Sequence, residues 1–435
     1  MYLQPAFSLL ALSCLVSSGL GASISASIHS KPSVAAAWYA GWHATAGFPL
    51  SKVSWSKYTH LTYSFAETTS SVRSLDLSGS DPTLLPQFVA EAHKHVRAPD
   101  ISVKNAILTP GQGVKALVSI GGWTGSRFYS SDVGSAANRT AFVQTVINFV
   151  EKYDLDGLDF DWEYPGSQGI GCNVVSGADA ANFLSFLQEL RANPRGKKLI
   201  LSAATSLSPF AGPDGDPLSD VSGFAAVLDW IAIMNYDVWG PWSSSVGPNA
   251  PLDDSCAAPE NQDGSAISAV QAWNQAGIPL HQIVLGVAAY GHSFTVPKSD
   301  AFVSGSKNTL AAYPTFDASN PPVGDSWDDG AGVDECGNLQ GPGGDVDFWG
   351  LVDLGYLNTD GAPKKNIAYR YDSCSQTPYV YNSTSQIMVS FDNAQSFAAK
   401  GKFILNKGLR GFAMWEAGGD FNDILLNSIR KAASL

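Results

Sequence analysis

Charged side chains are scarce in this sequence, and basic ones are the scarcer kind. Only 15% of the 435 residues are Asp, Glu, Lys or Arg, and 39 acidic against 26 basic residues give a formal net charge of -13. Such a chain repels polyanions, so we expect neither a nucleic acid nor an anionic membrane surface as a partner. A neutral or cationic substrate fits this charge better.

Long apolar runs are also missing. Residues 7–20 (FSLLALSCLVSSGL) form a short run followed by small residues, and no other run is long enough to span a bilayer. This is typical of a secretory signal, although no Lys or Arg precedes the run; a buried N-terminal helix is the less favoured alternative. We predict residues 1–22 as a signal peptide and a mature chain that is secreted, extracellular and not anchored in a membrane.

Cysteine is rare, and no pair has the C-x-x-C spacing of a zinc site, so we expect no metal and no cofactor. Cys14 would leave with the signal peptide. The even number that remains in an exported chain favours two disulfides, for which three pairings are open. We expect Cys172 to pair with Cys256, and Cys336 with Cys374, because the latter two lie within one long segment between regular elements.

Apolar stretches of strand length alternate with helical patterns along the chain. In residues 139–153, for example, apolar side chains recur at intervals of three and four, which predicts a helix with one buried face. Residues 420–433 form the last such pattern, with Asp420 as the expected N-cap. The strands we predict are residues 34–42, 59–66, 114–122, 155–163, 198–206, 229–237, 282–290 and 409–417.

Eight alternating strands and helices predict an α/β fold of the (β/α)8 TIM-barrel type. An open doubly wound sheet would need a Gly-rich phosphate loop or a switch-point signature, and the sequence has neither. One connection, after the seventh strand, is far longer than a usual loop and ends in residues 366–382, which alternate like an antiparallel sheet. We therefore predict a barrel of residues 30–292 and 385–435, with a small α+β insertion domain, residues 293–384, between strand seven and helix seven.

The segment DGLDFDWEYP, residues 156–165, places carboxylates in a stretch that otherwise resembles a buried strand. Because alternate residues of a strand share a face, Asp159, Asp161 and Glu163 point one way, and the Leu, Phe and Trp between them point the other. In a barrel, the apolar set meets the helices and the acidic set lines the interior. Asp156 falls near the start of the strand and is interpreted as structural.

Three carboxylates about 6.6 Å apart along one strand are close enough to couple their protonation. Burial and mutual repulsion raise such pKa values, which leaves the outermost one, Glu163, as a protonated donor near neutral pH. A purely structural acidic ladder would cost several kcal/mol, because the segment offers no basic partner. The pattern therefore indicates a general acid at the mouth of the barrel, where active sites of this fold lie.

Four motifs in order give the sequence a close resemblance to the family 18 glycoside hydrolases, the chitinases. Residues 156–163 match the signature D-x-x-D-x-D-x-E, and residues 119–122 (SIGG) match S-x-G-G. Residues 234–237 (MNYD) and 413–420 (AMWEAGGD) resemble the motifs of the sixth and eighth strands. The resemblance covers almost the whole mature chain and includes the insertion typical of the secreted, deep-groove branch.

This resemblance implies a role for each matching residue. Glu163 would protonate the glycosidic oxygen, Asp161 would hold the substrate acetamido N–H, and Asp159 would share a proton with Asp161. Tyr236 would donate to the acetamido carbonyl, whose oxygen attacks C1 in place of an enzyme nucleophile. Trp415 would form the floor beneath the distorted sugar, with Met234 and Asp237 shaping the same pocket.

Aromatic residues near the predicted strand ends extend this site into a groove. Taken singly, each is more often a core residue than a ligand, but as a set at one barrel face they favour a sugar cleft. Trp239 has such a position as well. The substrate-binding residues we predict are Tyr39, Trp42, Phe65, Gly122, Trp123, Tyr164, Met234, Asp237, Tyr290 and Trp415.

Three functions fit these motifs: an endo-acting chitinase, an endo-β-N-acetylglucosaminidase on N-glycans, and a non-catalytic chitin-binding lectin. The insertion and the aromatic set favour the first, and the intact acids disfavour the third. We expect a monomer that binds chitin and N-acetylglucosamine oligosaccharides, with glycosylation acceptors at Asn138 and Asn382. His292 stands where many relatives carry Arg, and we assign it no catalytic role.

Overall fold

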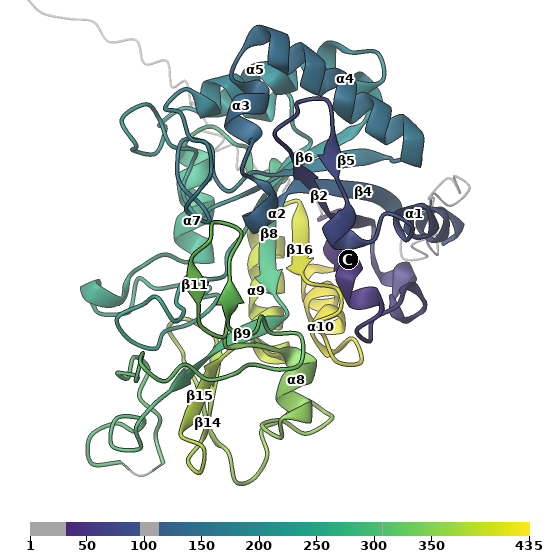
Figure 1. Ribbon diagram of the computed structural model, residues 1–435. Helices are drawn as coiled ribbons and strands as arrows, with labels where there is room; N and C mark the ends of the chain where they lie inside the picture. Colours follow the sequence, from purple (N-terminus) through teal and green to yellow (C-terminus); the bar gives the residue numbers. More distant parts are fainter. Residues whose placement is uncertain (1–31, 96–112, 307) are drawn as a thin grey trace, which may run out of the picture.

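The computed structural model describes residues 32–95, 113–306 and 308–435, which contain a closed barrel of eight parallel strands (Figure 1). The predicted signal peptide, residues 1–22, lies outside the described residues. Strand β1 pairs with both β2 and β16, which closes the sheet. The barrel strands, in chain order, are β1 (Val34–Ala40), β2 (His60–Thr68), β4 (Lys115–Gly121), β5 (Gly157–Asp161), β6 (Ile200–Thr205), β7 (Trp230–Ile233), β8 (Ile283–Ala288) and β16 (Gly411–Trp415).

All eight predicted strands are present, and the TIM-barrel prediction is confirmed. A short strand, β3 (Leu75–Asp76), adds to the edge of β2 in antiparallel orientation. None of the described helices is both long and apolar enough to cross a membrane. The described α-helices are α1 (Leu85–Lys94), α2 (Gly122–Gly125), α3 (Tyr129–Val133), α4 (Ala136–Tyr153), α5 (Asp179–Ala192), α6 (Ser222–Ala225), α7 (Ala266–Gln275), α8 (Phe348–Asp353), α9 (Ala394–Lys407) and α10 (Ile424–Ala433).

The last helix begins later than its sequence pattern suggests. Asp423, not Asp420, is the N-cap residue of α10. The Asp420 carboxylate nevertheless accepts hydrogen bonds from the backbone N–H groups of Leu425 and Leu426, at 3.1 and 2.9 Å. Asp420 therefore binds free N–H groups of the first turn although it lies outside the helix, and so acts as a cap from three residues before the N-cap position.

Strand β5 has the expected alternation of faces. Phe160 is fully buried and contacts Phe183 and Phe186 of helix α5, with ring centroids 5.8 and 5.6 Å apart. Asp159 and Asp161 point to the other face and into the barrel. The apolar residues of the strand thus contact the helix layer, while its acidic residues face the interior of the barrel.

A second, antiparallel sheet stands beside the barrel mouth, in the lower half of Figure 1. Its strand order is β12-β9-β15-β14-β13, and a separate hairpin, β10–β11, projects from the same segment. The sheet begins at Tyr290 and ends at Ser390, so it extends a few residues beyond the predicted boundaries of the insertion, 293–384. Its strands are β9 (Tyr290–Thr295), β10 (Gly332–Val333), β11 (Leu339–Gln340), β12 (Asp345–Asp347), β13 (Ala368–Tyr371), β14 (Pro378–Asn382) and β15 (Ile387–Ser390).

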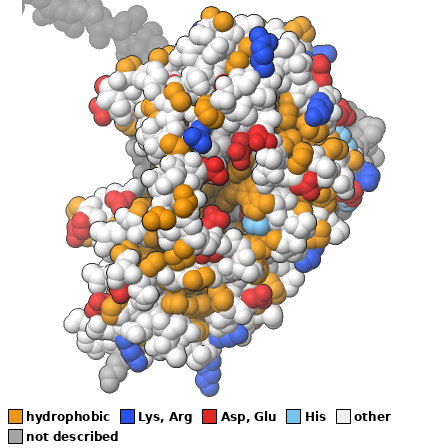
Figure 2. Space-filling view, viewed as in Figure 1, with side chains coloured by type: hydrophobic (Ala, Val, Ile, Leu, Met, Phe, Trp, Pro, Cys, Tyr) orange, Lys and Arg blue, Asp and Glu red, His pale blue; other side chains and the backbone are white. Residues whose placement is uncertain are grey.

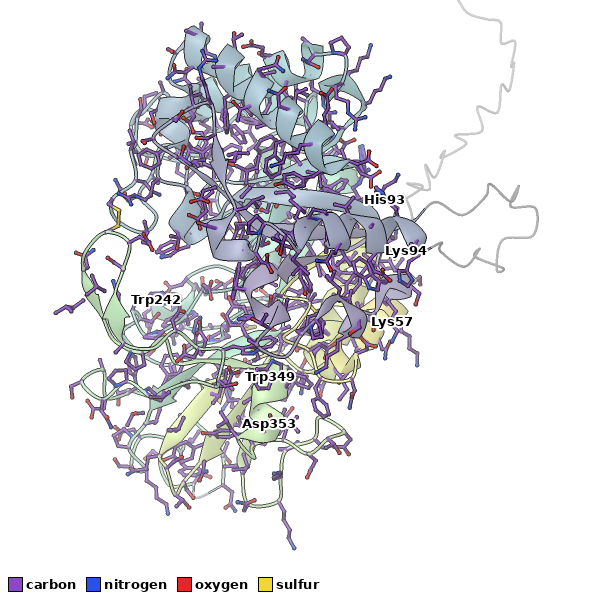
Figure 3. The ribbon with its side chains drawn as sticks, turned by 45° about the vertical axis from the view of Figure 1, so that its right-hand side comes forward. Lys57, His93, Lys94, Trp242, Trp349 and Asp353 are labelled. Atoms are coloured by element: carbon purple, nitrogen blue, oxygen red, sulfur yellow. A yellow bond between two sulfur atoms is a disulfide. The ribbon has the colours of Figure 1, made fainter. Side chains whose placement is uncertain are left out.

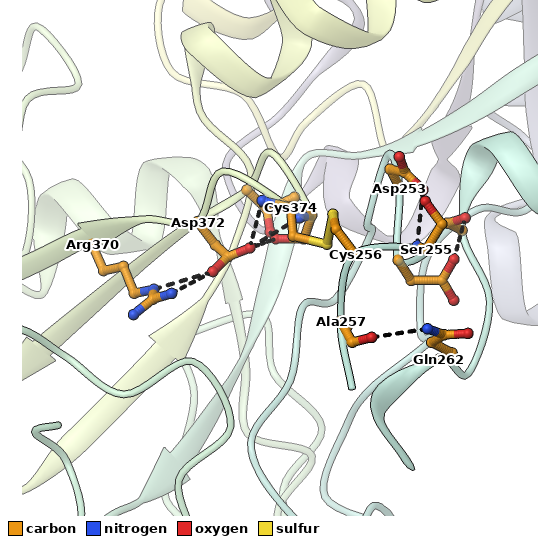
Figure 4. Close-up of a disulfide and its surroundings, with 12 residues drawn as sticks. Asp253, Ser255, Cys256, Ala257, Gln262, Arg370, Asp372 and Cys374 are labelled. Atoms are coloured by element: carbon orange, nitrogen blue, oxygen red, sulfur yellow. Dashed lines mark hydrogen bonds and ion pairs between the residues drawn. A yellow bond between two sulfur atoms is a disulfide. The ribbon is translucent and has the colours of Figure 1, made fainter. Parts of the chain in front are cut away.

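The predicted disulfide pairing is wrong. Cys172 is bonded to Cys336 and Cys256 to Cys374, across 164 and 118 residues of sequence. Each bridge joins a barrel loop to the insertion, and Figure 4 shows the second, where the Asp372 carboxylate accepts the Cys374 N–H at 3.0 Å. The insertion is therefore not stapled within itself. It folds back on the loops after β5 and β7, and the bridges form where these segments meet.

Candidate active site

Asp159 is the innermost carboxylate of strand β5 and is 2% exposed. It accepts hydrogen bonds from three neutral donors on neighbouring strands: Trp38 Nε1 at 2.9 Å, Ser119 Oγ at 2.8 Å and Ser202 Oγ at 2.6 Å. Burial raises its pKa, and the three donors oppose that rise because they favour the ionised form. Asp159 is thereby fixed to β1, β4 and β6 at the centre of the barrel.

Asp161 lies one layer closer to the mouth and is 4% exposed. Burial raises its pKa well above the ordinary value, and the neighbouring charges of Glu163 and Asp159 raise it further. Its Oδ1 atom has no hydrogen-bond partner among the described residues. A buried carboxyl oxygen without a partner is costly, so this atom is available to a donor on a bound molecule. The proton shared between Asp159 and Asp161 stays a prediction.

Glu163 follows the end of β5 and is partly exposed at the mouth of the barrel. Its backbone is held on both sides, since its N–H donates to Ser126 Oγ at 3.0 Å and its carbonyl accepts from Asn173 Nδ2 at 2.8 Å. Burial raises the pKa of its side chain to about 7. A hydrogen bond from Tyr164 lowers this pKa, and the negative charge of Asp237 raises it. Such a group both gives and takes a proton near neutral pH.

Two glycines of the SIGG motif make room for this arrangement. Gly121 and Gly122 have φ angles of +104° and +82°, which are strained for other residues. A Cβ on Gly121 would lie 2.2 Å from the Asp161 carbonyl oxygen, and one on Gly122 would lie 2.9 Å from the Phe65 ring. The motif thus lets β5 and an aromatic side chain approach β4 closely.

Aromatic side chains form the floor beside the carboxylates. Trp415 stacks on Phe65 with ring centroids 5.4 Å apart, and Phe65 stacks on Trp42 at 6.0 Å. Trp42 is 38% exposed, and Trp123, at the start of α2, is 51% exposed. Figure 2 shows hydrophobic side chains gathered in a hollow near the middle of this face, with acidic side chains around it. Flat apolar faces beside carboxylates suit a ring-shaped, hydroxylated ligand.

The opposite side of the site is a network around Asp237. The Tyr290 hydroxyl donates a hydrogen bond to Asp237 Oδ1 at 2.5 Å, and His292 Nε2 lies 2.8 Å from the same atom. His292 Nδ1 forms an ion pair with Asp345 at 2.6 Å. Burial lowers the pKa of His292, but the two carboxylates outweigh it and raise the value to about 10. His292 is therefore a buried cation that joins the barrel to the insertion.

Tyr39 is not a groove residue, which corrects the sequence prediction. Its side chain is 0% exposed, packs against Tyr63 and Phe88 and donates a hydrogen bond to the Phe48 carbonyl at 2.9 Å. Since residues of a strand alternate, its neighbour Trp38 points into the barrel instead and reaches Asp159. The two adjacent aromatics gave no signal as to which one faced inward. Trp239, at 2% exposed, is also buried.

Most of the other predicted residues lie together at the barrel mouth. Tyr236 and Met234 pack in one cluster with Tyr290 and Trp415. Asp156 pairs with His93 and Lys115, as expected of a structural residue. The glycosylation acceptors lie on α4 (Asn138) and at the end of β14 (Asn382), and both are partly exposed.

Several residues beside the site were not indicated by any sequence motif. His43 Nδ1 lies within hydrogen-bond distance of Glu416 Oε1, at 2.7 Å, and the ring stacks on Trp327 of the insertion, with centroids 3.9 Å apart. Trp242 is 64% exposed and meets His292 edge-on. The one sequence feature that could have pointed to Trp242 is the pair of tryptophans in WGPW, residues 239–242. Of these two, Trp242 is exposed and Trp239 is buried.

A (β/α)8 barrel with a line of carboxylates on its fourth strand and aromatic side chains around its mouth defines a site of the glycoside-hydrolase type. The model of glycosyl hydrolases family 18 matches residues 34–420. The chain belongs to this family.

Named relatives agree with this membership. A "chitinase-like effector" from Moniliophthora roreri is 53% identical over 411 residues, which cover 94% of this chain and 95% of the relative. "Chitinase A1" from Niallia circulans is 29% identical over 79% of this chain and 46% of its own length. A crystal structure of a chitinase from Rhizomucor miehei superposes with a TM-score of 0.79 at 30% identity, covering 92% of this chain and 100% of that one.

Proposed function

We propose that this protein is a secreted, endo-acting chitinase that hydrolyses β-1,4 bonds between N-acetylglucosamine units. The observation that carries the proposal is the position of two carboxyl groups, one above the other, at the barrel mouth. Glu163, with a pKa of about 7, lies above Asp161, whose buried Oδ1 has no partner. A donor poised near neutral pH beside an acceptor for an amide N–H matches the needs of an N-acetylated sugar.

The proposed reaction proceeds in two steps. Glu163 gives its proton to the glycosidic oxygen as that bond breaks, while the acetamido oxygen of the sugar attacks C1 and forms an oxazolinium ion. Asp161 accepts the acetamido N–H, and Tyr236 donates to the acetamido oxygen until it attacks. Glu163, now a carboxylate, then takes a proton from water as the water oxygen attacks C1. The oxazolinium ring opens, which restores the acetamide, and Glu163 is protonated again.

A binding protein without hydrolytic activity is the second candidate, because the relative from M. roreri is named a chitinase-like effector. Against it stand Asp159, Asp161 and Glu163, all present in this chain. Incubation with the hexamer of N-acetylglucosamine separates the two candidates: a chitinase releases shorter oligomers, whereas a binding protein returns the hexamer intact. An endo-β-N-acetylglucosaminidase, the third, would instead release glycans from an N-glycosylated protein.

Secretion is part of the proposal. Two disulfides, each joining the barrel to the insertion, suit an oxidising compartment such as the extracellular space. Recovery of the mature protein from the culture medium of its source, with a new N-terminus near residue 22, is the expected result. Retention inside the cell would contradict it.

The rate of hydrolysis should fall as the pH rises through about 7. Glu163 must be protonated to act as the acid, and its pKa of about 7 means that the protonated fraction is lost above that pH. The value of kcat/KM should therefore decline by about tenfold per pH unit on the alkaline side. Initial rates on the hexamer between pH 5 and 9 check this, with oligomer binding measured over the same range as the control. A flat profile up to pH 9 would contradict the assignment.

Tyr39→Phe should reduce stability and leave catalysis unchanged. The change removes the buried hydrogen bond to the Phe48 carbonyl, so the free energy of unfolding should fall by about 1 kcal/mol. Tyr236→Phe is the matched control, because it removes a hydroxyl that the proposal places on the substrate and should lower kcat. Denaturant titration and steady-state kinetics distinguish the two. If the Tyr39→Phe protein has normal stability but binds the oligomer about tenfold more weakly, Tyr39 is a substrate-binding residue after all.

A further inference from the structure

A hairpin of the insertion, residues 330–341, reaches back to the barrel. We call it the strap. It consists of β10 and β11, joined by a turn in which the Asp334 carboxylate accepts the backbone N–H groups of Cys336 at 2.9 Å and Asn338 at 2.7 Å. The turn is therefore ordered by its own hydrogen bonds, even though each strand has only two residues.

The tip of the strap is anchored to two barrel loops. Cys336 forms the disulfide with Cys172, in the loop after β5, and the Glu335 carbonyl accepts from Arg127 Nη1, in the loop after β4, at 3.4 Å. The segment that carries the strap leaves the barrel after β8. In the strand order β8-β7-β6-β5-β4, strand β4 is four positions from β8 in a barrel of eight, which is the opposite side.

The strap thus connects opposite sides of the barrel mouth, where the carboxylates lie. Figure 3 shows the hairpin reaching up from the second sheet to the yellow disulfide at the edge of the barrel. Its barrel anchor is close to the chemistry, because Cys172 precedes Asn173, whose side chain binds the Glu163 carbonyl at 2.8 Å.

The strap is held by its disulfide more than by packing. Val333 and Leu339, which pair across the hairpin, are 65% and 87% exposed. A Cβ placed on Gly330 or Gly337 would meet nothing within 4 Å. A two-stranded hairpin with so little buried surface is marginally stable by itself. Cleaving the bridge should therefore free the strap, while the sheet beneath it keeps its own core.

We propose that the strap, fixed by the Cys172–Cys336 disulfide, closes one side of the groove and makes the substrate enter lengthwise. This inference rests on the proposed function. The favoured substrates are then slim, unbranched N-acetylglucosamine chains and short oligomers that slide beneath the strap. Polymers with bulky groups on their sugar hydroxyls are excluded, because a covalently fixed strap cannot move aside for them.

The test compares two double variants. Cys172→Ala/Cys336→Ala frees the strap, and Cys256→Ala/Cys374→Ala removes the other bridge between barrel and insertion as the matched control. Hydrolysis is measured on the N-acetylglucosamine hexamer and on chitin that carries hydroxyethyl groups. Freeing the strap should raise the ratio of the polymer rate to the hexamer rate by about fivefold or more, and the control should leave that ratio unchanged.

Binding kinetics supply a readout that does not need hydrolysis. With Glu163→Gln added to each variant, the release of the hexamer is followed by tryptophan fluorescence. Freeing the strap should speed dissociation by about tenfold, since a closed groove lengthens residence. Bound hexamer with an unchanged dissociation rate and an unchanged substrate ratio would overturn the role of the strap. A protein that neither binds nor cleaves the hexamer would instead refute the proposed function, and the strap's role with it.

Failure of the strap variant to fold would not end the test. The Cys256→Ala/Cys374→Ala protein retains only the strap disulfide, so a phosphine reductant can open that bridge in the folded state. Near-ultraviolet circular dichroism confirms that the fold persists. Reduction should accelerate hexamer release, and reoxidation should restore the slow rate; release that is the same in both states would overturn the proposal.

Discussion

Glu163→Gln is expected to lower kcat on the N-acetylglucosamine hexamer by about a thousandfold or more. The amide keeps the shape of the carboxyl group but has no acidic proton to give to the glycosidic oxygen. Oligomer binding should change little, because the stacked aromatic floor of Trp415, Phe65 and Trp42, which we expect to hold the sugar rings, is unaltered. Turnover from initial rates, together with the dissociation constant from fluorescence, measures both quantities on one preparation.

Glu189→Gln is the matched control. This glutamate lies on helix α5, where it accepts a hydrogen bond from the Thr140 hydroxyl at 2.6 Å, away from the barrel mouth. The control tests whether any loss comes from the change of charge alone, and it should keep wild-type turnover. A Glu163→Gln protein with about a tenth of wild-type turnover would remove Glu163 from the role of the acid.

Strand positions were predictable because buried parallel strands are short, apolar and regularly spaced in the sequence. The same regularity located the carboxylates: once residues 155–163 are a strand, Asp159, Asp161 and Glu163 must share a face. These are local properties, set by a residue and its immediate neighbours. The pattern was insufficient only where it gave no contrast, as at Trp38 and Tyr39, both of which are aromatic.

Contacts between distant segments were not predictable in this way. The sequence allowed three disulfide pairings, and the choice among them depends on where the insertion folds relative to the barrel loops. Cys336 meets Cys172 only because the strap reaches from the insertion to the loop after β5. Similarly, His43 meets Trp327 across most of the chain, and no periodicity marks either residue. Such pairs arise from tertiary structure, which a single sequence does not display.

His292 shows how a departure from the family pattern acquires a physical meaning. An Arg at this position would be charged at any ordinary pH, and a His ordinarily would not. Here Asp237 and Asp345 lie 2.8 and 2.6 Å from its two ring nitrogens and keep it protonated. His292 therefore places at this point of the site the positive charge that the family resemblance would lead one to expect from an Arg, on a shorter side chain.

Fully deacetylated chitosan oligomers should not be hydrolysed at a measurable rate. If the nucleophile is the acetamido oxygen of the substrate, a sugar with a free amine lacks the attacking atom even when Glu163 is intact. Asp161 offers no replacement, because it is buried and its pKa is raised well above the ordinary value, which disfavours the ionised form that a nucleophile needs. Partially acetylated oligomers should be cut only where the sugar on the non-reducing side of the bond is acetylated. Mass spectrometry of the products reads this pattern directly.

The configuration of the first product tests the same mechanism independently. Attack by the acetamido oxygen inverts C1 once, and attack by water on the oxazolinium ion inverts it again, so the new reducing end must be the β-anomer. Proton NMR of fresh products from an acetylated oligomer measures the anomer before mutarotation. With Glu163→Gln as the control, the deacetylated oligomer should still bind through its ring contacts, which shows that its resistance lies in the chemistry. Predominantly α-anomer, or rapid cleavage of the fully deacetylated oligomer, would mean that the water or an enzyme group attacks C1 directly.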